Sequence, residues 1–282
     1  MAGPLWNSET PPPSPKISLL GWLFVVVRGL VLGTVTFGGL AILLLVRLVE
    51  QPIYGLHRPW TPFVTQFVCR AAFFILGIRY MVEGQLMPHR GAVVSNHVSW
   101  LDIFSLNAAK RVYFVSKSEV AGWPMIGWLA RATGTVFIDR DRKQAKKQKA
   151  MFESRLEAGH RLLFFPEGTS TDGLQVLQFK STLFAAFFTP ELQDHMWIQP
   201  ATLFYLAPKG QDARFYGWWG EMEFGGHFLH TLAAIRQGEV RLIYHDAVKV
   251  DDFTDRKSLA AHCEAEVRKG LEQCRQSGFS PV

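Results

Sequence analysis

A histidine and an aspartate, His97 and Asp102, lie five positions apart in the stretch Ser95 to Asp102 (SNHVSWLD). The apolar run Ala92 to Val94 precedes this stretch and a helical pattern follows it, so the pair is expected where a buried strand ends and a helix begins. With His97 in the loop and Asp102 in the first helical turn, one imidazole nitrogen can accept a proton while the carboxylate holds the other. The pair can thus activate a hydroxyl as a nucleophile.

A second interpretation of the same residues remains open. Ser99 as N-cap with Asp102 three residues later also fits a capping box, in which Asp102 only begins a helix. No serine lies in a Gly-x-Ser-x-Gly turn, so the nucleophile is expected to be a hydroxyl of the substrate.

A second loop follows another apolar run, Leu162 to Phe165. It reads Pro166-Glu167-Gly168-Thr169-Ser170, a turn whose backbone N–H groups and hydroxyls predict a cradle for an anion or an oxyanion. Glu167 is expected to bind a polar headgroup. Arg140 follows the predicted strand Thr135 to Ile138 and is a candidate phosphate ligand, although as a lone residue it also fits an ordinary surface charge.

The N-terminal part of the chain predicts contact with a membrane. Residues 1–16 are rich in proline and predict a disordered leader. Gly29 to Val46 is an uncharged run of 18 residues, preceded by the apolar segment Ile17 to Val27 and interrupted only by Arg28. A tilted span, a shallow hairpin bent at Gly33, Gly38 and Gly39, and a buried core helix all fit this run.

The remainder of the predicted membrane-associated region, residues 17–79, includes the amphipathic segment Phe63 to Ile78. Arg47, Arg58 and Arg70 follow the apolar run, which by the positive-inside bias places the downstream domain on the cytoplasmic face of the inner or cell membrane.

From residue 80 to residue 282, strands and helices alternate, which predicts an α/β domain with a mostly parallel sheet flanked by helices. The expected strands are Ala92–Ser95, Val112–Ser116, Thr135–Ile138, Leu162–Phe165, Ala201–Leu206 and Arg241–Val248. The expected helices are Leu101–Ala109, Trp123–Ala132, Arg142–Ala158, Leu174–Phe188, Phe228–Arg236 and Arg256–Cys274. In such sheets, active residues gather at the carboxyl ends of the strands, where both loops fall.

Charge is concentrated in one region. Between Lys110 and Arg161 there are twelve Lys or Arg residues against five Asp or Glu, in a chain of net charge +6. Such a region suits phosphates or a solvated helix, but it contains no recognisable nucleic-acid module, so nucleic-acid binding is not expected.

Taken together, these blocks resemble the glycerolipid acyltransferases, the lysophosphatidate acyltransferase family. The shared features are Asn96-His97 followed by Asp102, the Gly134 to Arg140 block, the Phe165 to Thr169 block and a hydrophobic block around Pro200, in the family's order. The resemblance covers roughly residues 80 to 210.

The resemblance implies an acyl transfer from acyl-carrier protein or acyl-CoA, as co-substrate, to the hydroxyl of a lysolipid, with no metal and no cofactor. His97 is then the general base and Asp102 its orienting partner. The implied substrate-binding residues are Asn96, Arg140, Glu167, Gly168, Thr169 and Ser170.

One departure bears on the acceptor. In the lysophosphatidate enzymes the last block usually continues Thr-Arg-Ser, whereas here Thr169 is followed by Ser170, Thr171 and Asp172. The missing arginine removes a phosphate partner. The stretch Arg214 to Glu223 resembles the branch that acylates lyso-ornithine lipid, although its aromatic residues also fit a packed corner. A membrane-attached lipid-binding protein and a hydrolase that uses water in place of the lysolipid are the alternatives.

Overall fold

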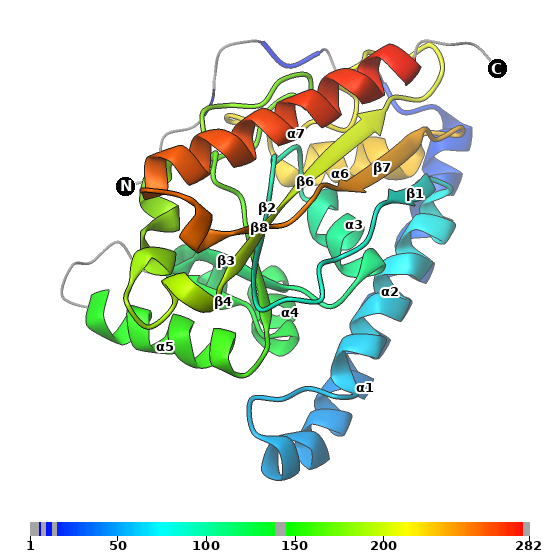
Figure 1. The fold of residues 1–282 in the computed structure, drawn as a ribbon. Helices are drawn as coiled ribbons and strands as arrows, with labels where there is room; N and C mark the ends of the chain where they lie inside the picture. The colour runs from blue at the N-terminus through cyan, green and yellow to red at the C-terminus, as the bar shows by residue number, and fades with distance from the viewer. Residues whose placement is uncertain (1–5, 7–9, 13–15, 139–144, 279–282) are drawn as a thin grey trace.

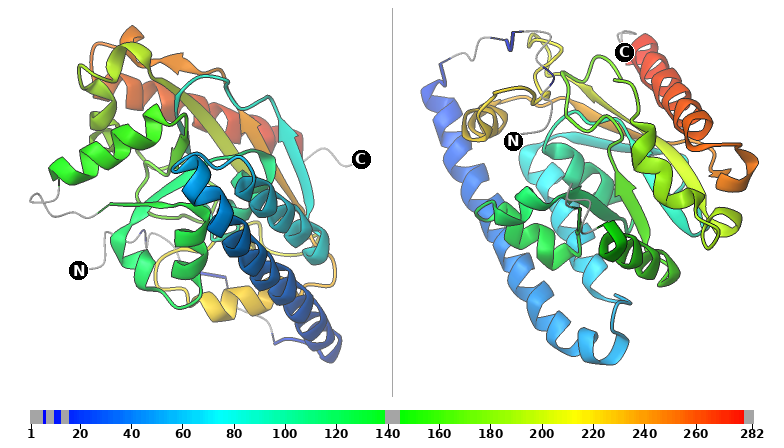
Figure 2. Two further views of the ribbon diagram at one scale, coloured as in Figure 1. Left: turned by 90° about the horizontal axis from the view of Figure 1, so that it is seen from below. Right: turned by 90° about the vertical axis from the view of Figure 1, so that its left-hand side faces the viewer.

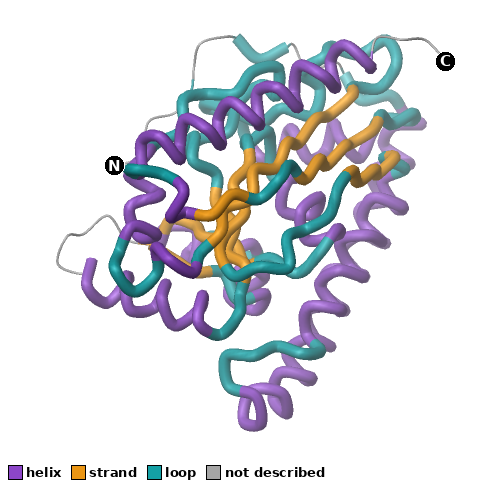
Figure 3. Tube along the Cα trace, in the orientation of Figure 1, coloured by secondary structure: helices purple, strands orange, loops and turns teal. Residues whose placement is uncertain are grey.

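A computed structural model describes residues 6, 10–12, 16–138 and 145–278. A mostly parallel eight-stranded sheet forms its centre, with the strand order β1-β7-β6-β2-β5-β3-β4 and β8 paired to β6 (Figures 1 and 3). Only the β6–β7 and β6–β8 pairs are antiparallel. The strands are β1 (Arg79–Glu83), β2 (Gly91–Ser95), β3 (Tyr113–Lys117), β4 (Val136–Ile138), β5 (Arg161–Phe164), β6 (Trp197–Leu206), β7 (Glu239–Tyr244) and β8 (Val248–Lys249). The predicted fold class is confirmed.

Helices cover both faces of this sheet (Figure 2). Strand β2 shows why: all five of its residues are buried, and its side chains alternate between two apolar clusters, Val93 in one and Ala92 and Val94 in the other. The first cluster packs against α1 (Leu19–Tyr54), α2 (Thr61–Leu76), α3 (Leu101–Ala109) and α6 (Phe224–Ala233). The second packs against α5 (Ala145–Glu157), the 3-10 helix η3 (Ser181–Phe188) and α7 (Arg256–Gly278). Helix α4 (Ile126–Thr133) precedes β4.

The N-terminal apolar segment is one continuous helix, α1, of 36 residues, long and apolar enough to cross a membrane by length and composition. The helix runs through Gly33, Gly38 and Gly39, so the shallow hairpin bent at these glycines is wrong. Only 22% of its most apolar 18-residue window is buried inside the protein, which also argues against a core helix. The chain instead turns after α1, and α2 packs beside it (Figure 1).

Two polar side chains on α1 fix its neighbours. Arg28 donates to the carbonyl oxygens of Leu232 (2.9 Å) and Ala234 (2.6 Å), which satisfies carbonyls at the C-terminal end of α6. Glu50, fully buried, accepts the backbone N–H groups of Trp60 and Thr61 and so caps the first turn of α2. The long helix is therefore tied to the rest of the molecule at two separate points.

One predicted helix and one unpredicted strand show the largest differences from the sequence-based expectation, beside shifts of a few residues at the ends of other elements. The predicted helix Leu174–Phe188 is irregular up to Lys180 and then forms η3. The cause is hydrogen bonding outside the segment, because the buried carboxylate of Glu167 accepts the N–H of Leu177 and the half-buried carboxylate of Glu264 accepts that of Phe179. Strand β1 was not predicted, since it is a short, half-exposed edge strand with a charged residue at each end.

Candidate active site

The two loops singled out in the sequence meet at one edge of the sheet. Strands β2 and β5 are parallel neighbours, so their carboxyl ends lie together, and His97 follows the first while Phe165 follows the second. The ring of His97 stacks on that of Phe165, with centroids 4.0 Å apart and planes 9° apart. The backbone N–H of Thr171 donates to the carbonyl oxygen of His97 at 2.9 Å. The second loop therefore holds the imidazole of the first.

His97 and Asp102 form a hydrogen-bonded pair. The distance from His97 Nδ1 to Asp102 Oδ2 is 2.7 Å, with the carboxylate side chain fully buried and the imidazole side chain 22% exposed. Because Nδ1 faces the carboxylate, it is the protonated nitrogen, and the lone pair lies on Nε2. Nε2 has no hydrogen-bond partner within the described part of the chain. It is therefore available to take a proton from a bound hydroxyl.

Asp102 also lies in the first turn of helix α3, so the hydrogen bonds expected of an orienting carboxylate and those expected at a helix start are both present. Its Oδ2 accepts the backbone N–H groups of Val98 (2.7 Å) and Ser99 (3.1 Å), and the Ser99 hydroxyl in turn accepts the N–H of Leu101. Its Oδ1 accepts the hydroxyl of Tyr205 at 2.8 Å. Three donors besides the imidazole thus fix the carboxylate, and capping and orienting are performed by the same group.

The side chain of Glu167 holds the backbone of His97. It is 1% exposed, and its two carboxylate oxygens accept the backbone N–H groups of His97 (2.9 Å) and Leu177 (3.1 Å). Burial raises the pKa of Glu167 to about 8, in spite of these two hydrogen bonds. Both oxygens of this buried carboxyl group are already bonded within the protein, so the placement revises the predicted headgroup-binding role: Glu167 positions the backbone of His97.

The raised pKa of Glu167 predicts how stability depends on pH. Between the ordinary glutamate pKa near 4.5 and the folded value of about 8, the unfolded chain is ionised while the folded chain keeps the proton. Stability should therefore fall as pH rises through this window, by up to about 1.4 kcal/mol per pH unit. The Glu167→Gln variant cannot ionise and lacks this slope. Unfolding of the two proteins in detergent between pH 5 and pH 9 tests this, and parallel stability curves would refute it.

The other predicted binding residues have different surroundings. Asn96 is buried, and its side-chain amide exchanges two hydrogen bonds with the backbone of Leu203 on β6, at 2.9 and 2.8 Å. As placed, it joins the loop to the sheet and does not face a substrate, which revises its predicted role. Arg140 lies outside the described residues.

The turn at Gly168 is shaped for an anion, but not through Gly168 itself. Its φ of +72° favours glycine, and its N–H donates to the carbonyl oxygen of Phe165 at 3.0 Å. The N–H groups of Thr169 and Ser170 have no hydrogen-bond partner among the residues described, which leaves them free for an oxyanion or another anion. The Ser170 hydroxyl donates to the carbonyl oxygen of Trp218 at 2.6 Å.

Several residues at the site were missed by sequence reasoning. Tyr205 lies within an apolar strand pattern, and nothing in the sequence pairs it with Asp102. His227 accepts the indole N–H of Trp100 at 2.9 Å, and burial lowers its pKa to about 4, which keeps it neutral. Lys180 lies beside Gly168 in the segment that was expected to be helical. Each contact depends on tertiary structure that spacing alone does not carry.

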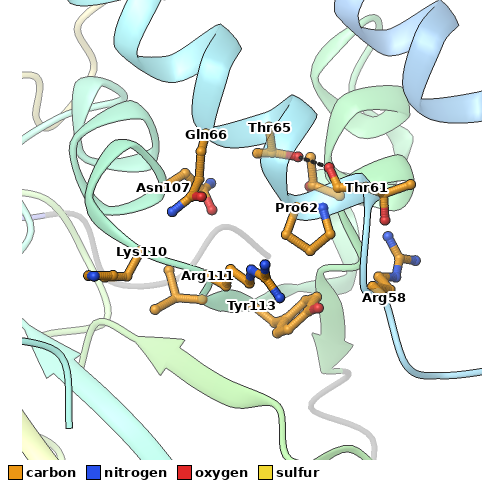
Figure 4. Close-up of a pocket in the computed structure, with 11 residues that line it drawn as sticks. Arg58, Thr61, Pro62, Thr65, Gln66, Asn107, Lys110, Arg111 and Tyr113 are labelled. Carbon is orange, nitrogen blue, oxygen red and sulfur yellow. Dashed lines mark hydrogen bonds between the residues drawn. The ribbon is translucent and has the colours of Figure 1, made fainter. Parts of the chain in front are cut away.

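A second polar cluster lies away from this site, at the amino end of β3. Figure 4 shows it around Arg58, Gln66 and Arg111, between the start of α2 and the turn before β3. Its cavity measures about 10 Å³, room for one water molecule and no substrate. Arg111 instead stacks on Phe63, with its guanidinium 4.0 Å from the ring centroid.

The fold and the paired loops define an acyltransferase, and comparisons with known proteins agree. The sequence model of the Acyltransferase family matches residues 79–202. The lyso-ornithine lipid O-acyltransferase of Rhodobacter capsulatus is 56% identical over 97% of this chain and 99% of its own. The protein of the same name from Rhizobium meliloti is 31% identical over 90% of this chain and 87% of its own.

Sequence similarity to the lysophosphatidate enzyme of Neisseria covers a shorter part of the chain, whereas the fold is shared over most of it. The 1-acyl-sn-glycerol-3-phosphate acyltransferase of Neisseria gonorrhoeae is 39% identical over 34% of this chain and 38% of its own. The crystal structure of the 1-acyl-sn-glycerophosphate acyltransferase PlsC from Thermotoga maritima shares the fold, with a TM-score of 0.63, 21% identity and coverage of 91% of this chain and 95% of its own.

The chain belongs to the acyltransferase family, as its residues predicted. Its extended similarity is to the proteins named lyso-ornithine lipid O-acyltransferase, which confirms the branch indicated by the stretch Arg214 to Glu223. It is therefore an acyltransferase of lipid biosynthesis that acts on a lysolipid acceptor and an acyl donor.

Proposed function

We propose that this acyltransferase moves an acyl chain onto the hydroxyl of lyso-ornithine lipid. The observation that carries the proposal is the 56% identity to the Rhodobacter capsulatus enzyme of that name across almost the whole of both chains. The serine at position 170 supports it, because the lysophosphatidate enzymes usually have an arginine there for a phosphate.

The proposed reaction needs no acyl-enzyme intermediate. His97 Nε2 accepts the proton of the acceptor hydroxyl, whose oxygen attacks the thioester carbonyl carbon of the donor. The carbonyl oxygen then carries a negative charge, for which the free N–H groups of Thr169 and Ser170 are the candidate donors. As the carbonyl re-forms, the new C–O bond is kept, the C–S bond breaks, and the proton on His97 returns to the leaving thiolate.

The donor, in this proposal, is acyl-carrier protein or acyl-CoA, and the protein works at the cytoplasmic face of the inner membrane. Support for the membrane comes from α1, where Leu19, Leu23 and Leu30 are 91%, 58% and 68% exposed. An apolar surface of this length on a helix is otherwise uncommon in a soluble protein. A cysteine scan from Leu19 to Val46 with an impermeant thiol reagent in sealed vesicles decides whether α1 crosses the bilayer, since a spanning helix is labelled from both sides at its two ends.

The acceptor is tested with detergent-purified protein and radiolabelled acyl donor, offered lyso-ornithine lipid, lysophosphatidate or no acceptor. We expect label to enter lyso-ornithine lipid, with little transfer to lysophosphatidate. Preferred acylation of lysophosphatidate would overturn the proposed acceptor. Release of free labelled fatty acid at the same rate with and without acceptor would identify a hydrolase instead.

A further inference from the structure

Lys180 places a positive charge on the turn that follows β5. Its backbone N–H donates to the carbonyl oxygen of Pro166 at 3.0 Å. Its ammonium group lies over Gly168, so close that a Cβ added to this glycine would lie 2.5 Å from Nζ. The side chain is exposed, and it forms no ion pair with any residue that the structure describes. The charge is therefore available to a ligand.

This ammonium group lies next to the proposed reaction centre. The backbone N–H of Gly168 donates a hydrogen bond to the carbonyl oxygen of Phe165, and the ring of Phe165 stacks on that of His97. The unpaired N–H groups of Thr169 and Ser170 belong to the same turn. Because those two N–H groups are the candidate donors to the oxyanion, the ammonium group of Lys180 is the group on this turn that is left for a second anion beside the base.

The segment that carries Lys180 is held in place from both sides. Glu167 accepts the N–H of Leu177 at 3.1 Å, and Glu264 of α7 accepts the N–H of Phe179 at 2.8 Å. Neither carboxylate neutralises the lysine. Glu264 is paired with Arg268 at 2.9 Å, and Glu167 is buried beneath the turn with its pKa raised to about 8.

The chemistry of the acceptor supplies the matching anion. Ornithine itself has no hydroxyl, so the acylated hydroxyl lies on a fatty chain attached to it, which we take to be joined to one of its amino groups. The headgroup then keeps one carboxylate and one ammonium group. We propose that Lys180 binds this carboxylate and thereby selects an ornithine headgroup, an inference that rests on the proposed function.

Charge balance between the two kinds of acceptor supports this assignment. A phosphate monoester carries nearly two negative charges at neutral pH, and the lysophosphatidate enzymes usually place an arginine after Thr169. A carboxylate carries one. With Ser170 in place of that arginine, the described part of this turn has the single cation of Lys180, which matches the single charge of a carboxylate.

The experiment compares lyso-ornithine lipid with its carboxyl methyl ester, at saturating donor, for the wild type and the Lys180→Met and Lys180→Arg variants. A hydrogen bond to a charged group contributes about 1.5–3 kcal/mol, so the wild type should favour the free acid by about 10- to 100-fold in kcat/KM. Lys180→Met should lose this preference through a higher KM for the acceptor, and Lys180→Arg should keep most of it. The control is Lys110→Met, an exposed lysine at the other end of α3 from Asp102.

The outcomes separate this inference from the function on which it rests. If the wild type acylates neither lipid, the proposed function fails. If it acylates both equally well, or if Lys180→Met keeps the preference for the free acid, the role of Lys180 is overturned while the function stands. An effect of Lys180→Met on the KM of the donor alone would also overturn it. If the Lys180→Met protein folds poorly, the wild-type comparison still overturns the inference when both lipids are acylated equally well, and Lys180→Arg still overturns it when this variant loses the preference while folded.

Discussion

The His97→Ala variant should lose acyl transfer by about two to four orders of magnitude in kcat, the usual contribution of a positioned general base. Among the described residues where the two loops meet, His97 is the group with an unbonded basic nitrogen. Its Nδ1 is held by Asp102 at 2.7 Å, and its Nε2 has no hydrogen-bond partner. Without it, the acceptor hydroxyl must lose its proton to water. The KM values should change little, because the alanine removes no charged contact with either substrate.

This prediction is measured by single-turnover transfer from radiolabelled donor to lyso-ornithine lipid, with the thermal stability of both proteins recorded in the same detergent. His57→Ala, at an exposed histidine in the turn after α1, is the matched control and should retain full activity. Undiminished transfer by a folded His97→Ala protein would show that another group removes the proton.

The position of His97 was predictable because it depends on local pattern and one rule of topology. The apolar runs Ala92 to Val94 and Leu162 to Phe165 are found as strands β2 and β5, and helix α3 begins and ends where predicted. Parallel neighbouring strands bring their carboxyl ends together, so two loops about 70 residues apart meet without further information.

The rest of the site was not predictable because its roles depend on burial. Glu167 was expected to face a headgroup, but a carboxylate on a turn can point outward or inward with the same sequence, and here it accepts the N–H of His97. The same inward carboxylate holds the N–H of Leu177, so the apolar period from Leu174 onward predicted a helix that tertiary hydrogen bonds prevent. Because a helix was expected over this segment, Lys180 was not predicted to lie beside Gly168.

The second large effect is expected at Asp102, and the structure predicts two different magnitudes for two substitutions. In Asp102→Asn, the N–H groups of Val98 and Ser99 and the Nδ1–H of His97 all point at the Oδ2 position, so the amide oxygen should occupy it. The amide nitrogen then faces Tyr205, whose hydroxyl can accept as well as donate. The histidine tautomer is kept and only the negative charge is lost.

The negative charge of Asp102 stabilises the imidazolium that forms when His97 takes the proton, so Asp102→Asn should reduce kcat by about 10- to 1,000-fold. Asp102→Ala removes both the negative charge and the hydrogen bond that orients His97, so its kcat should fall nearly as far as that of His97→Ala.

The Ser99→Ala variant separates these effects from helix capping, since it removes the hydroxyl that accepts the N–H of Leu101 and leaves the His97–Asp102 pair intact. If Ser99→Ala and Asp102→Asn lower the melting temperature and the activity in the same proportion, Asp102 acts only at the helix start. A drop in activity at Asp102→Asn far beyond its loss of stability would instead establish the carboxylate as the partner of the base.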